Sequence, residues 1–197
     1  MSGLRERKKQ ETRKKILAAA LALFQELGFE NTTIDRIAEQ ADVARGTVFL
    51  HFPSKEVILA HWTQERMHDL LERSTEWNQP ELSCEEKILR IFKIFTIKNR
   101  EHFDLVRISV RSILTSNTAA LHDQEQRRSL RNLFADVLEE GQEQGQLSAD
   151  VDPIIAASML ENIYLHATYD WVLADGIWPI EEILATKVHY LFGGLNR

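Results

Sequence analysis

Cysteine occurs once in the 197 residues, at position 84. A single thiol cannot form an intramolecular disulfide, and it cannot supply a metal site built from several thiolates. The sequence also lacks a run of about 18 apolar residues and the basic start, apolar core and cleavage site of a signal peptide. We therefore expect no metal site, no membrane span and a cytoplasmic location.

Motifs that carry catalytic chemistry are missing as well. The sequence contains no phosphate-binding P-loop, no GxSxG elbow, no HExxH pair and no glycine-rich dinucleotide turn. We expect neither a cofactor nor enzymatic activity. Apolar residues make up 44% of the chain and charged residues 27%, a composition typical of a globular protein.

Proline is scarce too, and its four positions mark the ends of predicted helices. Pro53 and Pro80 follow helical segments, whereas Pro153 and Pro179 suit the first turn of a helix. Between them apolar residues recur at helical spacing, with no strand alternation and no internal repeat. The sequence therefore predicts an all-α protein of about nine helices.

One stretch, residues 33–56, reads TIDRIAEQADVARGTVFLHFPSKE and has the layout of a helix-turn-helix that reads DNA. Its apolar spacing predicts a first helix over residues 33–41, followed by a compact turn at 41–43. A second helix over residues 44–51 would follow and end at Pro53. Such a second helix is the element that enters the major groove of DNA.

The second helix has distinct inner and outer faces. Val48 and Phe52 fall at positions i and i+4 on its inner side. The remaining side chains are distributed over its outer and flanking faces, where they can contact a partner. They are Arg45, Gly46, Thr47, Phe49, Leu50 and His51.

The segment GTVFLHFPSKEVIL, preceded by TIDRIAEQADVA, closely resembles the N-terminal DNA-binding domain of the tetracycline-repressor (TetR) family. The match covers roughly residues 10 to 60. The resemblance implies a homodimeric all-helical regulator with an N-terminal three-helix bundle, which contains the helix-turn-helix. It implies a DNA-binding domain over residues 1–53 and an effector-binding and dimerisation domain over residues 54–197.

Two positions depart from the pattern of that family. Ala44 stands where the family often has serine, and Phe49 stands where it usually has a tyrosine whose hydroxyl contacts phosphate. Phe49 cannot donate that hydrogen bond. Its ring can instead contact a thymine methyl group or pack against the sugar backbone.

The net charge of −6 is distributed unevenly along the chain. Residues 1–60 carry 10 basic and 8 acidic side chains, net +2, whereas the rest carry 14 and 22, net −8. The first fifteen residues alone have a net charge of +5, as expected of an arm that lies along DNA phosphates. A solvated leader is the alternative reading of this arm.

Arg45 is the strongest candidate for base recognition, because a guanidinium at the start of a recognition helix can bind guanine O6 and N7 together. A phosphate contact is the alternative for this residue. Lys55 opens the next helix, where backbone N–H groups favour anions, and is expected to clamp a phosphate. The expected DNA contacts are Thr33, Ala44, Arg45, Gly46, Thr47, Phe49, His51 and Lys55.

Aromatic and polar side chains beyond residue 54 could line an apolar cavity for a hydrophobic or aromatic effector, although each could instead be ordinary core. The candidates are His61, Trp62, Phe92, Phe95, Phe103, Tyr164 and Tyr169. The last two predicted helices carry more apolar surface than one small domain needs, which favours a dimer interface over internal core alone. The candidates for this interface are Ile155, Met159, Ile163, Val188, Leu191 and Phe192.

These features together predict a ligand-responsive transcriptional repressor. A homodimer would place two recognition helices on a palindromic operator in double-stranded DNA, and a small effector would release it. The alternative is a helix-turn-helix protein whose C-terminal domain binds a protein partner instead of a small ligand.

Overall fold

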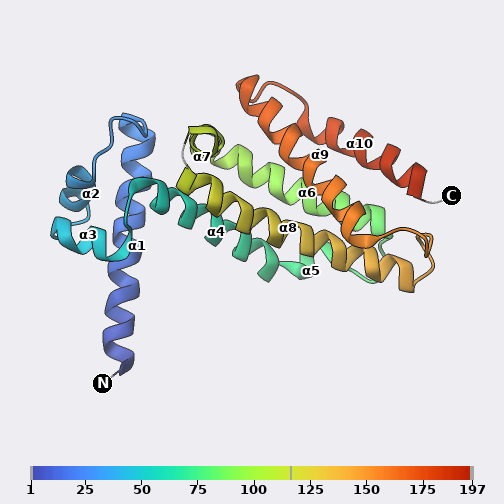
Figure 1. Cartoon of the computed structure of the whole chain (residues 1–197), viewed down its shortest axis with the longest axis horizontal. Coiled ribbons are helices and arrows are strands. Elements are labelled where there is room, and N and C mark those ends of the chain that lie inside the picture. The colour runs from blue at the N-terminus through green and yellow to red at the C-terminus, as the bar shows by residue number, and fades with distance from the viewer. Residues whose placement is uncertain (1, 116, 196–197) are drawn as a thin grey trace. The chain divides into compact units, whose positions relative to one another are not determined.

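The computed structural model describes residues 2–115 and 117–195, with side chains for all of these except residues 2, 70–71, 74–75, 113–127 and 195. The described residues form helices and no strand, so the all-α prediction is confirmed (Figure 1). They contain nine helices of seven residues or more, together with the single turn α5 (Ser74–Trp77). The nine are α1 (Ser2–Leu27), α2 (Ile34–Gln40), α3 (Arg45–His51), α4 (Lys55–Glu72), α6 (Cys84–Glu101), α7 (Phe103–Thr115), α8 (Asn117–Glu143), α9 (Pro153–Leu173) and α10 (Ile180–Leu195).

The chain divides into two compact units. Unit 1 comprises residues 1–66 and 107–122, and unit 2 comprises residues 67–106 and 123–197. The expected domain boundary at residues 53 and 54 falls inside unit 1, because the first three turns of α4 belong to that unit. Within the described helices, none is both long and apolar enough to cross a membrane.

Unit 1 is built on the second half of α1. Ile16, Ala20 and Phe24 are buried on one side of this helix, and Val48 and Phe52 from the α3 region are buried with them in the core. This burial removes apolar surface from water and fixes where α3 lies. The prediction that Val48 and Phe52 face inward is confirmed.

The turn that ends α1 is held by a buried threonine. Gly28 has a φ of 80°, which terminates the helix, and the Thr32 hydroxyl donates to the carbonyls of Leu23 and Gly28 at 3.1 and 2.8 Å. Since the hydroxyl has one proton, the two carbonyls share it. The turn brings the chain back toward α2.

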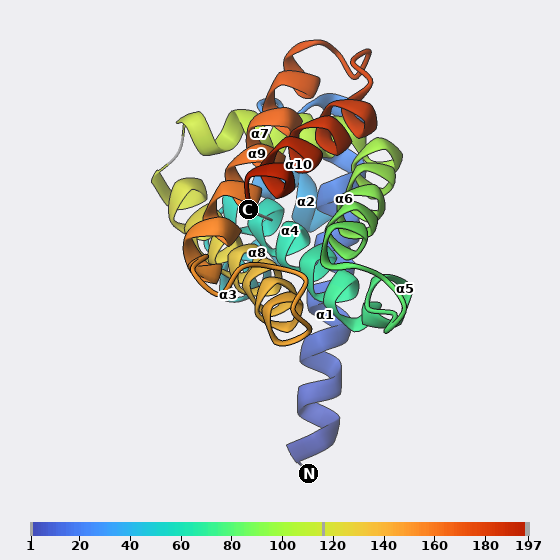
Figure 2. The same cartoon turned by 90° about the vertical axis from the view of Figure 1, so that its right-hand side faces the viewer.

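Unit 2 contains α6, α9 and α10, and α9 and α10 run side by side in both views (Figures 1 and 2). Ser83 and Glu86 form a reciprocal capping box at the start of α6. Asp152 caps α9 and accepts hydrogen bonds from the two backbone N–H groups of Ile154 and Ile155. These local signals fix where both helices begin.

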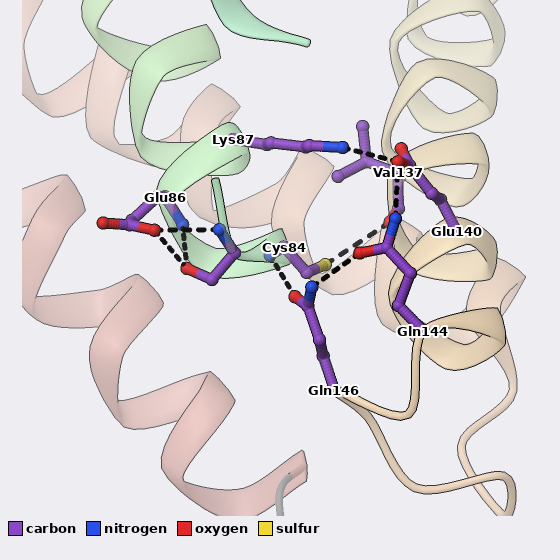
Figure 3. Close-up of polar contacts among 8 residues, drawn as sticks. Cys84, Glu86, Lys87, Val137, Glu140, Gln144 and Gln146 are labelled. Carbon is purple, nitrogen blue, oxygen red and sulfur yellow. Dashed lines mark hydrogen bonds and ion pairs between the residues drawn. The ribbon is translucent and has the colours of Figure 1, made fainter. Parts of the chain in front are cut away.

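Figure 3 shows how the start of α6 is joined to the end of α8. The Lys87 ammonium donates to Glu140 at 2.7 Å, and its side chain is only 2% exposed. The Cys84 N–H donates to the Gln146 side chain at 2.6 Å, and its thiol donates to the Val137 carbonyl at 3.4 Å. An ion pair with a buried ammonium and two further hydrogen bonds thus hold the two helices at this point.

Gly141 lies inside α8, at the place where this helix meets Cys84. A Cβ built at position 141 would lie 2.9 Å from the Cys84 Cβ and 3.0 Å from its Sγ. Both distances are shorter than van der Waals contact, so an alanine at position 141 would clash with Cys84. The glycine therefore permits the close approach of α6 and α8.

Cys84 is expected to resist alkylation in the folded protein. Burial raises the pKa of its thiol from the ordinary value of 9.0 to about 12, so almost none of it is thiolate at pH 8. A raised pKa contributes stability that is present below pH 9 and is lost as the pH rises from 9 toward 12. Iodoacetamide labelling followed by mass spectrometry should detect modification in urea but not in buffer, and rapid labelling in buffer would contradict this environment.

Candidate DNA interface and ligand-binding region

The helix-turn-helix of unit 1 forms as its sequence predicts, to within one residue at each helix end. Between α2 and α3, Asp42 adopts a left-handed conformation with a φ of 54°, which aspartate tolerates better than most residues. The Val43 N–H donates to the Ala38 carbonyl at 3.0 Å and closes the turn. The turn therefore presents α3 at a fixed angle to α2.

Two of the predicted contact residues stand at the starts of these helices. The Thr33 hydroxyl accepts a hydrogen bond from the Arg36 N–H at 3.3 Å and caps α2. Its proton remains able to donate to a phosphate. Ala44 caps α3 without a side-chain hydrogen bond, so it contributes only its backbone and methyl group.

The outward face of α3 carries most of the remaining candidates. Arg45 and Phe49 are exposed, whereas Thr47 and His51 are partly exposed. Gly46 has no atom within 4 Å of where a Cβ would lie, so the helix surface is open there. The side chain of Leu50 is 82% exposed, although it is not among the expected contacts.

Arg45 is held in place by two neighbours. Its Nε lies 3.3 Å from a carboxylate oxygen of Asp35, and its guanidinium lies 5.5 Å from the centre of the Phe49 ring. All three side chains are exposed, so the contacts orient the guanidinium and contribute little to stability. Sequence reasoning missed Asp35, whose position in the first turn of α2 was its only signal.

Lys55 has an environment that the sequence did not suggest. Its ammonium donates to the Phe29 carbonyl at 2.7 Å and to the carbonyls of Glu30 and Thr32 at 3.3 Å each. The ammonium also lies 4.5 Å from the centre of the Phe29 ring. It therefore joins the start of α4 to the turn after α1, and a phosphate contact would require it to leave these carbonyls.

Lys55→Met is therefore expected to lower the free energy of unfolding by about 1 to 2 kcal/mol, because three carbonyls lose a charged donor near the surface. Urea denaturation at one fixed protomer concentration measures this loss. Lys15→Met, at an exposed position of α1, is the control and should change stability by less than about 0.5 kcal/mol. Unchanged stability, with a weaker salt dependence of DNA binding, would instead assign Lys55 to phosphate.

His51 ends α3 next to the positive side chains of α1. Burial, and then the charges of Arg13 and Lys9, lower the pKa of His51 below its ordinary value of 6.5. The Arg13 guanidinium lies 5.0 Å from the centre of the Phe52 ring. One face of α1 therefore adjoins the last turn of α3.

Three of the ligand-pocket candidates come together in unit 2. Phe92 stacks on Tyr164 with ring centres 5.5 Å apart, and Phe95 lies 5.0 Å from the same ring. Phe134 meets Phe92 edge-on at 5.4 Å, although it is not among the candidates. We call Phe92, Phe95, Phe134 and Tyr164 the aromatic cluster.

Buried polar groups accompany the aromatic cluster, and no local pattern in the sequence predicts them. The Asn99 amide donates to the Tyr164 hydroxyl at 2.8 Å in a buried environment. One turn further along α9, the buried Thr168 hydroxyl oxygen has no hydrogen-bond partner among the described residues. An unsatisfied buried hydroxyl is unfavourable unless another group binds it.

The other pocket candidates have neighbours outside the aromatic cluster. Phe103 packs edge-on against Trp171 at 4.8 Å, and Tyr169 is at the surface. His61 and Trp62 belong to unit 1, where His61 lies 3.3 Å from Glu65 and Trp62 is covered by Arg66. The sequence could not separate these positions because α4 contributes residues to both units.

The dimer candidates divide into surface and core residues. Ile155 and Met159 are 61% and 45% exposed on α9, and Ile163 and Leu191 are partly exposed. Val188 and Phe192 are only 0% and 2% exposed, because this face of α10 packs on α6 and α9. These two side chains are core residues of the protomer and present no surface to a second copy. On α9, on α10 and in the loop between them, exposed apolar residues that were not predicted are Ile154, Leu173, Ile177, Trp178 and Tyr190.

Metal binding has no support in the part of the chain with described side chains, where no group of three or more His, Cys, Asp or Glu residues could hold an ion.

Two family models match this sequence and together cover most of it. Residues 16–61 match the model described as bacterial regulatory proteins of the tetR family. Residues 81–195 match the tetracyclin repressor-like C-terminal domain.

Similar proteins extend the likeness over nearly the whole chain. The fatty acid metabolism regulator protein of Bacillus subtilis is 26% identical over 184 residues, which is 92% of this chain and 94% of that relative. Thermus thermophilus FadR, a TetR-family repressor solved with lauroyl-CoA, superposes with a TM-score of 0.79 at 24% identity, covering 92% of this chain and 94% of its own. Bacillus subtilis FadR, solved with stearoyl-CoA, gives 0.77 at 23% identity, with 92% and 98% covered.

The two structural matches support the fold, and the family models cover both the helix-turn-helix and the C-terminal helices. This chain belongs to the TetR family: it is a transcriptional regulator that binds DNA through its helix-turn-helix, and it is not an enzyme.

Proposed function

We propose that this protein is a homodimeric repressor released from a palindromic operator by a fatty acyl-CoA. The observation that carries the proposal is the buried aromatic cluster of unit 2, in a chain related over nearly its full length to regulators solved with acyl-CoA. An acyl chain is apolar and flexible, so an apolar interior with few polar groups suits it. The proposal narrows the expected hydrophobic or aromatic effector to the fatty acyl-CoAs.

The aromatic cluster is a suitable place for the acyl chain because it joins three helices. Phe92 and Phe95 come from α6, Phe134 from α8 and Tyr164 from α9. All four rings are buried and in contact, so a chain that enters here must displace at least one of them. Asn99 and Thr168 supply polar atoms that can receive a carbonyl or thioester group.

Displacement of these rings gives a physical route from effector to DNA. Helix α4 contributes residues 55–66 to unit 1 and residues 67–72 to unit 2, so a shift in unit 2 has a covalent path to α3. In a dimer, a changed separation of the two recognition helices would no longer match successive major grooves. A coupling of about 1 to 3 kcal/mol is sufficient to change operator occupancy 5- to 150-fold.

Dimerisation is proposed through the exposed side of α9. Ile155, Met159, Tyr169 and Leu173 are exposed at spacings of four, ten and four residues, which places them along one side of the helix. A two-fold axis across this stripe would pack it against the same stripe of a second copy and bury apolar surface on both copies. Two recognition helices per dimer also provide more DNA contacts than one module offers.

At the operator we propose that Arg45 binds a guanine and that Leu50 contacts a thymine methyl group. Both side chains are exposed on α3. Phe49 would support the guanidinium of Arg45, consistent with its missing hydroxyl. Thr33, Ala44, Gly46, Thr47 and His51 are proposed to lie against the backbone or groove edges around these two side chains.

Calorimetry with acyl-CoA of 8 to 18 carbons tests the effector proposal on the wild-type chain. We expect saturable binding whose affinity rises with chain length, because each buried CH₂ contributes about 0.8 kcal/mol. Coenzyme A alone should bind weakly. No binding of any acyl-CoA to the folded protein would reject the proposal and favour the alternative of a protein partner.

Two matched variants locate the acyl chain. Phe95→Leu removes one ring of the aromatic cluster, and Phe103→Leu removes one ring from the separate contact with Trp171. Only Phe95→Leu should change acyl-CoA affinity, by tenfold or so, if the cluster holds the chain. Equal effects of the two variants would place the ligand elsewhere.

A further inference from the structure

The first half of α1 extends beyond the core of unit 1. Residues 3–11 are all exposed, and the first buried side chain of the helix is Ile16. Figures 1 and 2 both show α1 projecting past α2 and α3 toward the N-terminus. The apolar core does not cover this segment. Because the segment is helical, residues four apart lie on the same side of it.

One face of this projecting segment is basic. Arg5, Lys9 and Arg13 are four residues apart and therefore lie on one side of the helix. Continuing the same spacing leads to Leu17, which is buried in the core of unit 1. The basic ladder, as we call these three side chains, thus lies on the side of α1 that faces α3.

Contacts at the end of α3 support this orientation. The Arg13 guanidinium lies 5.0 Å from the ring centre of Phe52, the residue that caps α3. Lys9 and Arg13 are both close enough to His51 to lower its pKa. The basic ladder therefore begins at the last turn of the recognition helix and continues away from it.

The opposite face of α1 differs in its pairing. The Arg7 Nε lies 3.6 Å from a carboxylate oxygen of Glu11, one helical turn away, and both side chains are exposed. Among the described residues, no acidic side chain forms an ion pair with Arg5, Lys9 or Arg13. Arg5 and Lys9 are exposed, so their charges are available to an anionic partner, whereas that of Arg7 is partly compensated. Arg13 is half-buried over the Phe52 ring and marks where the basic ladder meets unit 1.

We propose that the basic ladder binds the DNA phosphates that flank the major groove occupied by α3, so that α1 acts as a helical arm that extends the DNA contact. The nine residues 3–11 span about 14 Å at 1.5 Å per residue, equivalent to about four phosphates of one strand. The contact adds affinity and salt dependence but no sequence preference. The proposal rests on DNA binding by the helix-turn-helix and is independent of the effector.

Two double variants with equal charge changes test the arm. Arg5→Gln with Lys9→Gln removes two charges of the basic ladder, and Arg7→Gln with Lys14→Gln removes two from the opposite face. All four positions are exposed, and circular dichroism checks that both variants keep their helix content. Affinity is measured against salt concentration, both on a duplex that the wild-type chain selects from a random pool and on random duplex of equal length.

Each phosphate contact contributes about 0.9 to the slope of log K against log salt concentration. The variant that lacks the Arg5 and Lys9 charges should therefore have a slope smaller in magnitude by about 1.8. The control variant should lose less than about 0.5. Equal losses in the two variants, or no loss in either, would overturn the arm. Failure of the wild-type chain to select any duplex would instead contradict the proposed repressor, because the arm contact is still measurable on random DNA.

Discussion

Glu140→Ala is expected to lower the free energy of unfolding by about 3 kcal/mol. The substitution leaves the Lys87 ammonium buried at 2% exposure without its carboxylate, which lies 2.7 Å away in the native protein. Removing one partner of a buried pair typically costs 3 to 5 kcal/mol. We expect about the lower end of that range, because Glu140 is itself 34% exposed and water can partly replace it.

The partner substitution separates charge burial from lost packing. Lys87→Met keeps an unbranched apolar chain in the same space and leaves Glu140 at a position that water can reach, so it should cost less than about 1.5 kcal/mol. The double variant Lys87→Met with Glu140→Leu should recover most of the loss seen in Glu140→Ala. Urea denaturation of the three variants measures these losses. Equal losses for Glu140→Ala and Lys87→Met would mean that charge burial is not the cause.

The second large effect is expected at the DNA surface. Arg45→Ala should weaken binding to the selected duplex by about 5- to 150-fold, since a bidentate guanine contact discriminates by about 1 to 3 kcal/mol. On random duplex the loss should be several-fold smaller, because base contacts contribute little there. Fluorescence anisotropy at one fixed salt concentration measures both affinities.

Asp35→Asn is the matched variant for Arg45. It removes the carboxylate that lies 3.3 Å from the Arg45 guanidinium and leaves the guanidinium itself in place. Loss of a negative charge near phosphates should tighten binding to both duplexes. If Arg45→Ala weakens both duplexes equally, Arg45 is a phosphate contact and the guanine assignment is wrong.

Helix boundaries and caps could be predicted because their signals are local. Thr33 caps α2, Asp42 turns the chain toward α3, and Asp152 caps α9, each acting within three residues of its own position. Such positions depend on backbone hydrogen bonds that a neighbouring side chain either satisfies or does not. The family resemblance then supplied the role of the helix-turn-helix.

Features that depend on distant residues could not be predicted. Lys55 binds the carbonyl of Phe29, 26 residues away, and no local pattern distinguishes this from a phosphate contact. Val188 and Phe192 belong to an apolar stripe that suits either a dimer interface or a core, and the choice depends on where α10 packs. The pairing of Asn99 with Tyr164 likewise arises only once α6 and α9 meet.

An acyl-CoA that occupies unit 2 should release the protein from DNA. The wild-type protein is bound to a fluorescent form of its selected duplex, and palmitoyl-CoA, palmitate or coenzyme A is added at the same concentration. We expect anisotropy to fall to the value of free DNA with palmitoyl-CoA and to stay unchanged with coenzyme A. A complex that persists while calorimetry shows the protein saturated with palmitoyl-CoA would contradict release by an acyl-CoA.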